Sequence, residues 1–187
     1  MLLEPRDKSL EAAHAPTPPA RSRKVCENGN DREARLNMLY GSLLGGMAFA
    51  NAPVGAVHAL AYPVGANFKV AHGLSNSLML PHVLKFNGVD PTADRLYGEM
   101  LGDAFPEIAA EVAAGGGGGR SNTELFASGF EALAADLGIE TRLSQVGISE
   151  SDVELLASQA MQQTRLLPNN PREMFEKDAI KLYAQAM

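Results

Sequence analysis

The sequence predicts an all-α, multi-helix domain, and three kinds of observation support this prediction. Apolar residues recur at the three- and four-residue spacing of a helix face across most of the chain. Capping residues, prolines and glycines divide the chain into segments of helical length. No segment shows the sustained alternation of β-branched residues that predicts a strand. The 187 residues are enough for one domain with its own core.

The first strong helix is predicted from Asp31 to about Ala52, because acidic residues at its start complement the positive end of the helix dipole. Large residues at helical spacing predict a stripe that packs into the core, and they are Leu36, Tyr40, Leu43 and Met47. Phe49 and Leu60 are expected to pack in the core as well. A second face carries only small residues, Gly41, Gly45 and Ala48, and would allow another helix to approach closely.

Two further core helices are expected on either side of a turn. A helix that carries His58 is predicted to end near Tyr62, because Pro63 removes a backbone donor and Gly65 permits a left-handed turn. The next helix is predicted from residue 73 to about residue 86. Ser75 and Asn76, near its start, are expected to bond backbone groups rather than a substrate.

The rest of the chain is predicted to be amphipathic helix. The expected helices span residues 90–101, 122–137, 150–163 and 171–186, with a short apolar connection at 143–148. The glycine run at 115–119 follows an alanine-rich helix and has no strand before it. It is therefore predicted to be a flexible loop rather than a phosphate cradle.

Composition narrows the class of protein. The net charge of −6 argues against partners such as nucleic acid and anionic membranes. A single cysteine, Cys26, excludes an internal disulfide and is typical of the reducing cytosol, so a cytoplasmic location is predicted. From residue 36 to 84 Lys69 is the only charged side chain, but Asn, Pro and His interrupt every window long enough for a membrane span. We therefore expect buried core helices there.

Residues 1–23 are predicted to be a disordered or loosely attached segment, separate from the helical domain at 24–187. They contain Pro5, Pro16, Pro18 and Pro19 and few large apolar residues. The start lacks the long apolar stretch of a signal peptide. His14 is expected to be a solvated histidine of this segment.

Two histidines lie inside the apolar block, where an imidazole needs a hydrogen bond or a ligand. His58 and His72 are 14 residues apart, which would separate them by about 21 Å on one continuous helix. If the chain turns between them, both imidazoles lie on adjacent helices. Two neutral imidazoles in such a place are a usual beginning of a transition-metal site.

The segments GAVHALAYPVG (55–65) and AHGLSNSLMLPHVLKFN (71–87) resemble the second signature of the iron-containing (group III) alcohol dehydrogenases. The similarity continues through LGIETRL (137–143) and NNPRE (169–173), and covers about residues 24–187. In this family an α/β nucleotide-binding domain precedes an all-helical metal-binding domain, and this chain resembles only the second. No glycine-rich turn of a nucleotide-binding βαβ unit is found.

The resemblance implies roles for the two histidines. The family binds its metal through one aspartate and three histidines, and His58 and His72 match the last two ligands. The first two would lie before residue 1, so an incomplete metal site is expected. Many members have another histidine where this chain has Tyr62, which is not expected to serve as a proton relay. His82 matches the L-P-H histidine of the family and is not expected to be a ligand.

In the intact family a divalent metal, commonly Fe²⁺ and sometimes Zn²⁺, acts as a Lewis acid on an alcohol or aldehyde oxygen. Hydride passes between the substrate and NAD(P). The resemblance thus implies a partial alcohol dehydrogenase, and the chain alone is expected to bind metal weakly and to be inactive. Pairing with a nucleotide-binding domain or with a second copy is expected.

Two alternatives remain. In the first alternative, the chain is a non-enzymatic helical module whose uncovered apolar surface mediates association. In the second, it is part of an enzyme that catalyses another reaction. Maleylacetate reductases and dehydroquinate synthase-like enzymes share the architecture. Dehydroquinate synthase would need a phosphate-binding constellation that is not found in this sequence. Maleylacetate reductases usually depart from the AHGLSN–LPH pattern that is present here.

Overall fold

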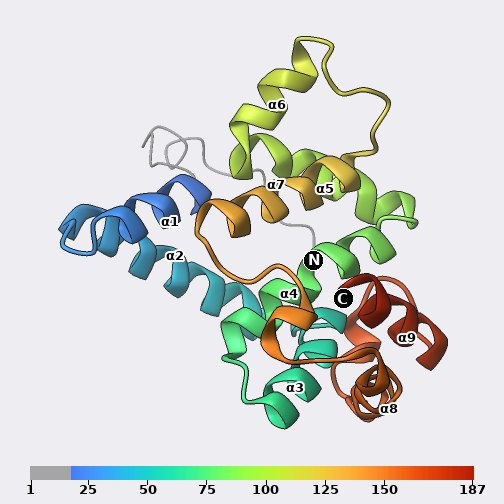
Figure 1. Cartoon of the computed structure of the whole chain (residues 1–187). Coiled ribbons are helices and arrows are strands. Elements are labelled where there is room, and N and C mark those ends of the chain that lie inside the picture. The colour runs from blue at the N-terminus through green and yellow to red at the C-terminus, as the bar shows by residue number, and fades with distance from the viewer. Residues whose placement is uncertain (1–17) are drawn as a thin grey trace.

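The computed structural model describes residues 18–187, and all regular secondary structure in that part of the chain is helical (Figure 1). The all-α prediction is therefore confirmed. The α-helices are α1 (Pro18–Glu27), α2 (Arg32–Asn51), α3 (Ala56–Phe68), α4 (His72–Asn87), α5 (Pro91–Ala104), α6 (Pro106–Ala113), α7 (Asn122–Asp136), α8 (Val153–Met161) and α9 (Glu176–Gln185). Short 3₁₀ turns are η2 (Leu143–Val146), η3 (Glu150–Asp152) and η4 (Leu167–Asn169).

Two apolar clusters share helix α4. The larger cluster joins α3, α4, α8 and α9, and its fully buried members include Leu60, Leu156 and Tyr183. The smaller cluster joins one side of α4 to α5, α6 and α7 around Phe105 and Phe126, whose rings meet edge to face. Leu60 is thus a core residue, as predicted. Because α4 contacts both clusters, it fixes the position of the histidine at its first residue.

Helix α3 continues through Pro63, so the prediction that it ends near Tyr62 is wrong. Its carbonyl at Leu60 accepts a hydrogen bond from the buried Tyr183 hydroxyl at 2.6 Å, in the turn that Pro63 perturbs. The chain reverses only at Lys69, which adopts the left-handed conformation at φ 56°. A Cβ on Gly65 would lie 3.2 Å from the Val70 carbonyl oxygen. Gly65 therefore permits close approach of the turn instead of forming it.

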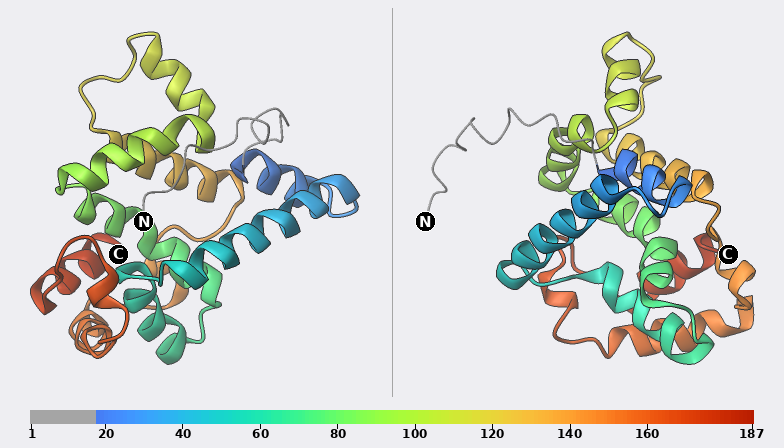
Figure 2. Two further views of the ribbon diagram at one scale, coloured as in Figure 1. Left: turned by 180° about the vertical axis from the view of Figure 1, so that it is seen from behind. Right: turned by 90° about the vertical axis from the view of Figure 1, so that its left-hand side faces the viewer.

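Helix α2 departs most from expectation, because its predicted core stripe is solvent-exposed. Leu36, Tyr40, Leu43 and Met47 are 65%, 52%, 58% and 58% exposed, and Phe49 is 55% exposed. With α1, helix α2 forms an arm that extends away from the other helices (Figures 1 and 2). Among the described elements α1 is its main neighbour. The periodicity correctly predicted a helix, but no described element covers its apolar face.

The first described residues also differ from expectation. Residues 18–23 belong to helix α1 instead of being unstructured, since proline is tolerated in the first turn of a helix. Arg23 reaches Asp136 of α7, with its Nη2 2.9 Å from Oδ2, so α1 is attached to the body. Residues 1–17, including His14, lie outside the described part of the chain.

Most of the remaining boundaries agree with the sequence. The predicted helices at 90–101, 122–137 and 150–163 correspond to α5, α7 and η3 with α8, and the glycine run forms a turn after α6. The start of the last helix was predicted wrongly, because α9 begins at Glu176 instead of Pro171.

No single described helix has the length and apolar composition of a membrane span. Helices α2 and α3 have this length and composition only when they are taken together, and the chain bends by 110° between them.

Candidate metal centre

The structure brings His58 and His72 together. His58 lies in the first turn of α3, and His72 is the first residue of α4. The connection Lys69–Ala71 folds α4 back along α3, so the two ring centroids lie 5.2 Å apart with a 54° angle between the planes. Two imidazoles that share a cation through Zn–N-type bonds of about 2.1 Å have ring centroids about 5 Å apart. The observed separation therefore suits a shared cation.

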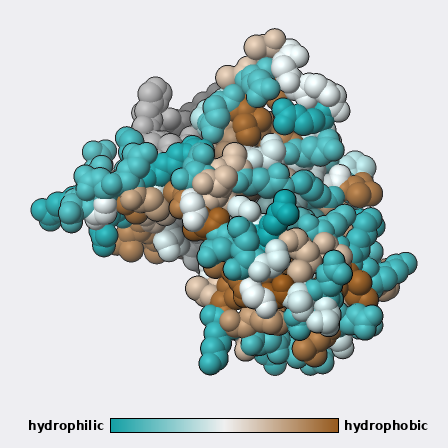
Figure 3. Space-filling model, in the orientation of Figure 1, coloured by the Kyte–Doolittle hydropathy of each residue, from teal (hydrophilic) through white to brown (hydrophobic). Residues whose placement is uncertain are grey.

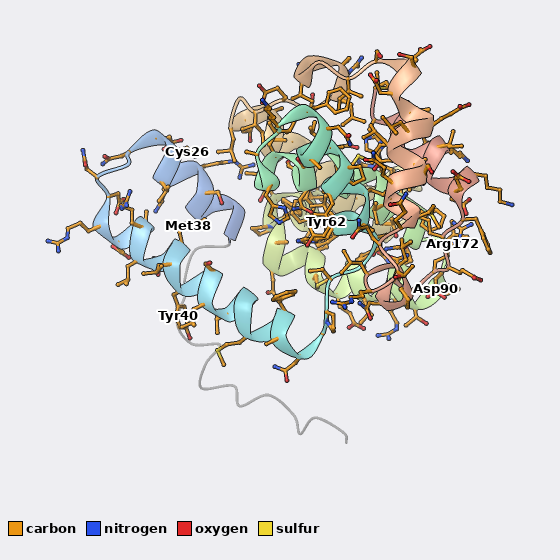
Figure 4. The ribbon with its side chains drawn as sticks, turned by 90° about the horizontal axis from the view of Figure 1, so that it is seen from below. Cys26, Met38, Tyr40, Tyr62, Asp90 and Arg172 are labelled. Carbon is orange, nitrogen blue, oxygen red and sulfur yellow. The ribbon has the colours of Figure 1, made fainter. Side chains whose placement is uncertain are left out.

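Tyr62, labelled in Figure 4, forms a cluster of three rings with His58 and His72. Its ring centroid lies 6.2 Å from that of His58, edge to face, and 5.9 Å from that of His72. Tyr62 is one helical turn after His58, so both side chains project from the same face of α3. The Tyr62 side chain remains 41% exposed, which leaves the cluster open to solvent on that side.

The environment favours neutral imidazole at His58. Burial lowers the pKa of the half-buried His58 from its ordinary value of 6.5, and the nearby His72 lowers this pKa further. His58 therefore stays neutral to lower pH than a free imidazole. A neutral ring has a nitrogen lone pair, which is what a metal ion requires.

His82 lies apart from the ring cluster. It is ten residues after His72 on α4, which corresponds to about 15 Å along the helix axis. Burial lowers the pKa of His82 first, and the Lys85 ammonium lowers it further, whereas Glu131 acts in the opposite direction. Lys85 itself pairs with Glu131 at 2.7 Å. His82 thus lies in a different polar environment from the histidine pair.

Within residues 18–187 no group of three or more His, Cys, Asp and Glu side chains is arranged to hold a metal ion. Among the described residues, His58 and His72 are the two histidines whose rings approach each other here. An open pocket borders His58, and its other lining residues include Val57, Asn76 and Leu80.

A network of amides missed by the sequence analysis holds the first turn of α3. The Asn170 Oδ1 accepts hydrogen bonds from the Ala56 amide at 3.4 Å and from Asn87 Nδ2 at 3.1 Å. Its Nδ2 donates to Asn87 Oδ1 at 2.7 Å and to the Arg172 carbonyl at 2.6 Å. Asn170 thereby ties the start of α3, two residues before His58, to the end of α4. The NNPRE segment (169–173) contributed to the family resemblance. Its contact with α3 could not be predicted, because Asn170 lies 114 residues after Ala56 in the sequence.

Asn76 and Ser75 bond backbone groups, as predicted. Ser75 Oγ donates to the Ala71 carbonyl at 3.1 Å, and Asn76 Nδ2 donates to the His72 carbonyl at 2.9 Å. The same Asn76 Nδ2 lies 3.1 Å from His72 Nε2. Asn76 is therefore part of the immediate surroundings of the histidine pair.

Comparisons with known proteins add independent information. The family model described as "Fe-containing alcohol dehydrogenase family, C-terminal" matches residues 20–187. Long-chain-alcohol dehydrogenase 1 of Geobacillus thermodenitrificans is 38% identical over 169 residues, covering 88% of this chain and 40% of the relative. An NAD-dependent methanol dehydrogenase of Bacillus methanolicus is 31% identical over 165 residues, covering 88% of this chain and 41% of the relative.

Solved structures give the same result. A 1,3-propanediol oxidoreductase superposes with a TM-score of 0.76 at 29% identity, covering 90% of this chain and 42% of that one. An alcohol dehydrogenase from Oenococcus oeni also gives a TM-score of 0.76, at 26% identity and with the same coverage. The chain therefore spans about two fifths of the length of the relatives that it matches.

Proposed function

This chain belongs to the Fe-containing alcohol dehydrogenase family, and from that premise we propose that His58 and His72 are two of the protein ligands of a divalent cation, Fe²⁺ or Zn²⁺. The family predicted from the sequence is thereby confirmed. The observation that supports the proposed ligands is the approach of the two rings to 5.2 Å from different helices. Imidazole nitrogen suits both metals.

We further propose that the whole protein transfers hydride between a small alcohol or aldehyde and NAD(P). The names of the relatives support this assignment, since they include alcohol, propanediol and NAD-dependent methanol dehydrogenases. The cation would act as a Lewis acid on the substrate oxygen. In this chain His58 and His72 would hold the cation, and the open side near Tyr62 would leave room for the substrate. Residues that bind the nucleotide would lie in an α/β domain of the kind the family implies.

The location proposed for the protein is the cytoplasm. The single cysteine, Cys26, is free and exposed, which is typical of a reducing compartment. The helical domain of the family is proposed to span residues 24–187.

Metal titration tests the proposed ligands. Zn²⁺ added to the purified chain at pH 7 should bind with an affinity that falls at least about 100-fold when both His58 and His72 are replaced by alanine, because the site loses both nitrogen ligands. Isothermal titration calorimetry measures this change. His82→Ala is the matched control, since it removes a histidine of the same helix about 15 Å away, and it should leave the affinity unchanged. Equal binding by the wild type and the double variant would refute the assignment.

A second candidate function is association through α2, and its exposed apolar face favours this role. The large exposed side chains of this α2 face are Leu36, Leu39, Tyr40, Leu43, Leu44 and Met47, and Met38 and Phe49 are exposed on the other side of the helix. Figure 3 shows apolar surface along the arm formed by α1 and α2, and Figure 4 places Met38 and Tyr40 on this arm, away from Tyr62. Apolar patches of this size usually mark contact surfaces. We therefore propose contact with a second copy or with a nucleotide-binding domain.

Charge substitutions test the α2 face. Replacing Leu39 and Leu43 with lysine should reduce self-association and the binding of a hydrophobic dye several-fold, because charged side chains interrupt the apolar face. Sedimentation velocity over a concentration series measures the association. Lysine at Val89 and Leu155 is the control, since these residues are 69% and 50% exposed elsewhere on the surface. A wild-type chain that stays monomeric at high concentration and binds no dye would argue against this candidate.

A further inference from the structure

The exposed apolar face of α2 has the residue spacing of a seam between two paired helices. Its central line repeats at intervals of four, three and four residues, through Leu36, Tyr40, Leu43 and Met47. All four of these residues are at least half exposed. The line runs along most of a helix of 20 residues, which is about 30 Å long. Side chains with this spacing interdigitate with those of a second helix that has the same spacing.

Helix α1 packs against the opposite side of α2 and leaves the seam uncovered. On that side Ala34 is buried, and the Ser22 hydroxyl donates to the Met38 sulfur at 3.7 Å. Ala34 and Met38 lie about 160° around the helix from Leu36. The first turn of α2 lies at the tip of the arm, and its last turn joins the body that α3–α9 form (Figures 1 and 2). A second helix can therefore reach the seam along the whole arm.

The charges at the two ends of α2 favour an antiparallel partner. The last turn has no basic side chain, although its terminal carbonyls form the negative end of the helix dipole. In the first turn, Arg32 and Arg35 lie on one edge of the seam and Glu33 lies on the other, which leaves a net positive charge there. The Asp31 carboxylate lies away from the seam and accepts a hydrogen bond from the Ala34 amide.

Two copies of α2 satisfy this pattern when they run in opposite directions. The arginines of each copy then lie beside the uncompensated last turn of the other copy. In a parallel pair, the same arginines would face one another and repel. Antiparallel pairing also places the two bodies at opposite ends of the paired helices, whereas parallel pairing would crowd them at one end (Figure 1).

We propose that two copies of this chain pair through α2 as an antiparallel, twofold-symmetric dimer. This inference rests on the second candidate function and specifies its partner and its geometry. The twofold axis passes between residues 40 and 43. Tyr40 of one copy therefore packs against Leu43 of the second copy, and Leu36 packs against Met47 of the second copy. Such an interface uses the same surface on both copies.

The size of the α2 face is sufficient for a specific but reversible dimer. Its six large apolar side chains expose roughly 600 Å² in each copy, so that the pair buries roughly 1,200 Å², at the lower end of the range for specific interfaces. We therefore expect a dissociation constant in the micromolar range, which sedimentation velocity over a concentration series measures.

Disulfide trapping tests the orientation. Leu36→Cys and Met47→Cys chains, both also carrying Cys26→Ser to remove the single native thiol, are mixed and oxidised. A disulfide requires Cα atoms within about 7 Å, and two copies of residue 36 are roughly 16 Å apart in the antiparallel dimer. The mixed disulfide should therefore exceed each homodimeric disulfide by at least about 10-fold, as read by mass spectrometry. Val89→Cys and Leu155→Cys, on exposed residues elsewhere, are the controls and should form little of either product.

A charge reversal tests the end-to-end contact independently. Arg32→Glu should weaken self-association about 10-fold, because the carboxylate would face the negative last turn of the second copy. The same change places an acidic residue in the first turn of its own helix, where the dipole favours it, so far-UV circular dichroism should show no loss of helix. Arg165→Glu is the matched control, since it makes the same charge change on an exposed residue of the body. It should alter association less than about 3-fold.

The outcomes separate the dimer geometry from the proposal on which it rests. A dominant mixed disulfide together with weaker association of Arg32→Glu supports the antiparallel pair. If lysine at Leu39 and Leu43 abolishes association but the homodimeric disulfides dominate, the geometry is overturned and association through α2 stands. Equal weakening by Arg32→Glu and Arg165→Glu would likewise overturn the proposed end-to-end contact. If the wild-type chain stays monomeric at high concentration, the dimer and the self-association on which it rests both fail.

Discussion

Replacing Tyr183 with phenylalanine is expected to lower the free energy of unfolding by about 1–3 kcal/mol, because the Leu60 carbonyl loses its hydroxyl donor inside the core. Tyr183 is fully buried, and burial raises the pKa of its hydroxyl, which favours the protonated form that can donate. Tyr183→Ala also removes the ring and should cost about 3–5 kcal/mol. Urea unfolding followed at 222 nm measures both changes.

Tyr40→Phe provides the control for the Tyr183 variants. Tyr40 lies on the exposed face of α2, so removal of its hydroxyl should change the free energy of unfolding by less than about 0.5 kcal/mol. If Tyr183→Phe is as stable as the wild type, the Leu60 carbonyl does not depend on this donor.

This part of α3 shows why the sequence predicted the site better than its surroundings. The pairing of His58 with His72 followed from the spacing, the intervening turn and the family signature. The position of that turn did not, because Pro63 normally ends a helix. Pro63 is instead buried inside α3, where the same turn also makes a contact over 123 residues of sequence, between the Leu60 carbonyl and the Tyr183 hydroxyl. Local propensity cannot include such a contact.

Helix α2 shows a different limit. Its apolar periodicity correctly predicted a helix with one apolar face, including Leu36 and Tyr40. Periodicity predicts that one face of a helix is apolar, but it does not predict which element packs against that face. The described part of the chain leaves these residues exposed. Asn170 was harder still to predict, since a single asparagine carries no periodic signal and its role depends on neighbours in space.

Replacing Asn170 with alanine is expected to lower the free energy of unfolding by about 2–4 kcal/mol. Its side chain uses both its donors and its acceptor, to Ala56, Asn87 and Arg172. Asn87 is buried, so its amide would lose partners at both ends, and each unpaired buried group costs about 1–3 kcal/mol. Asn170→Asp should also destabilise, because a carboxylate would face the Asn87 and Arg172 carbonyl oxygens. Thermal or urea unfolding measures these effects.

The Asn170 variants should weaken metal binding as well, since the same side chain holds the first turn of α3 two residues before His58. Asn169→Ala is the matched neighbour. Asn169 is exposed and donates to the Val54 and Arg165 carbonyls, so its loss should cost less than about 1 kcal/mol. In a double-mutant cycle, Asn87→Ala combined with Asn170→Ala should cost clearly less than the two single changes added together, because each single change already removes both hydrogen bonds between the two amides. Strict additivity would mean that the two amides act independently, and α3 would then need another anchor.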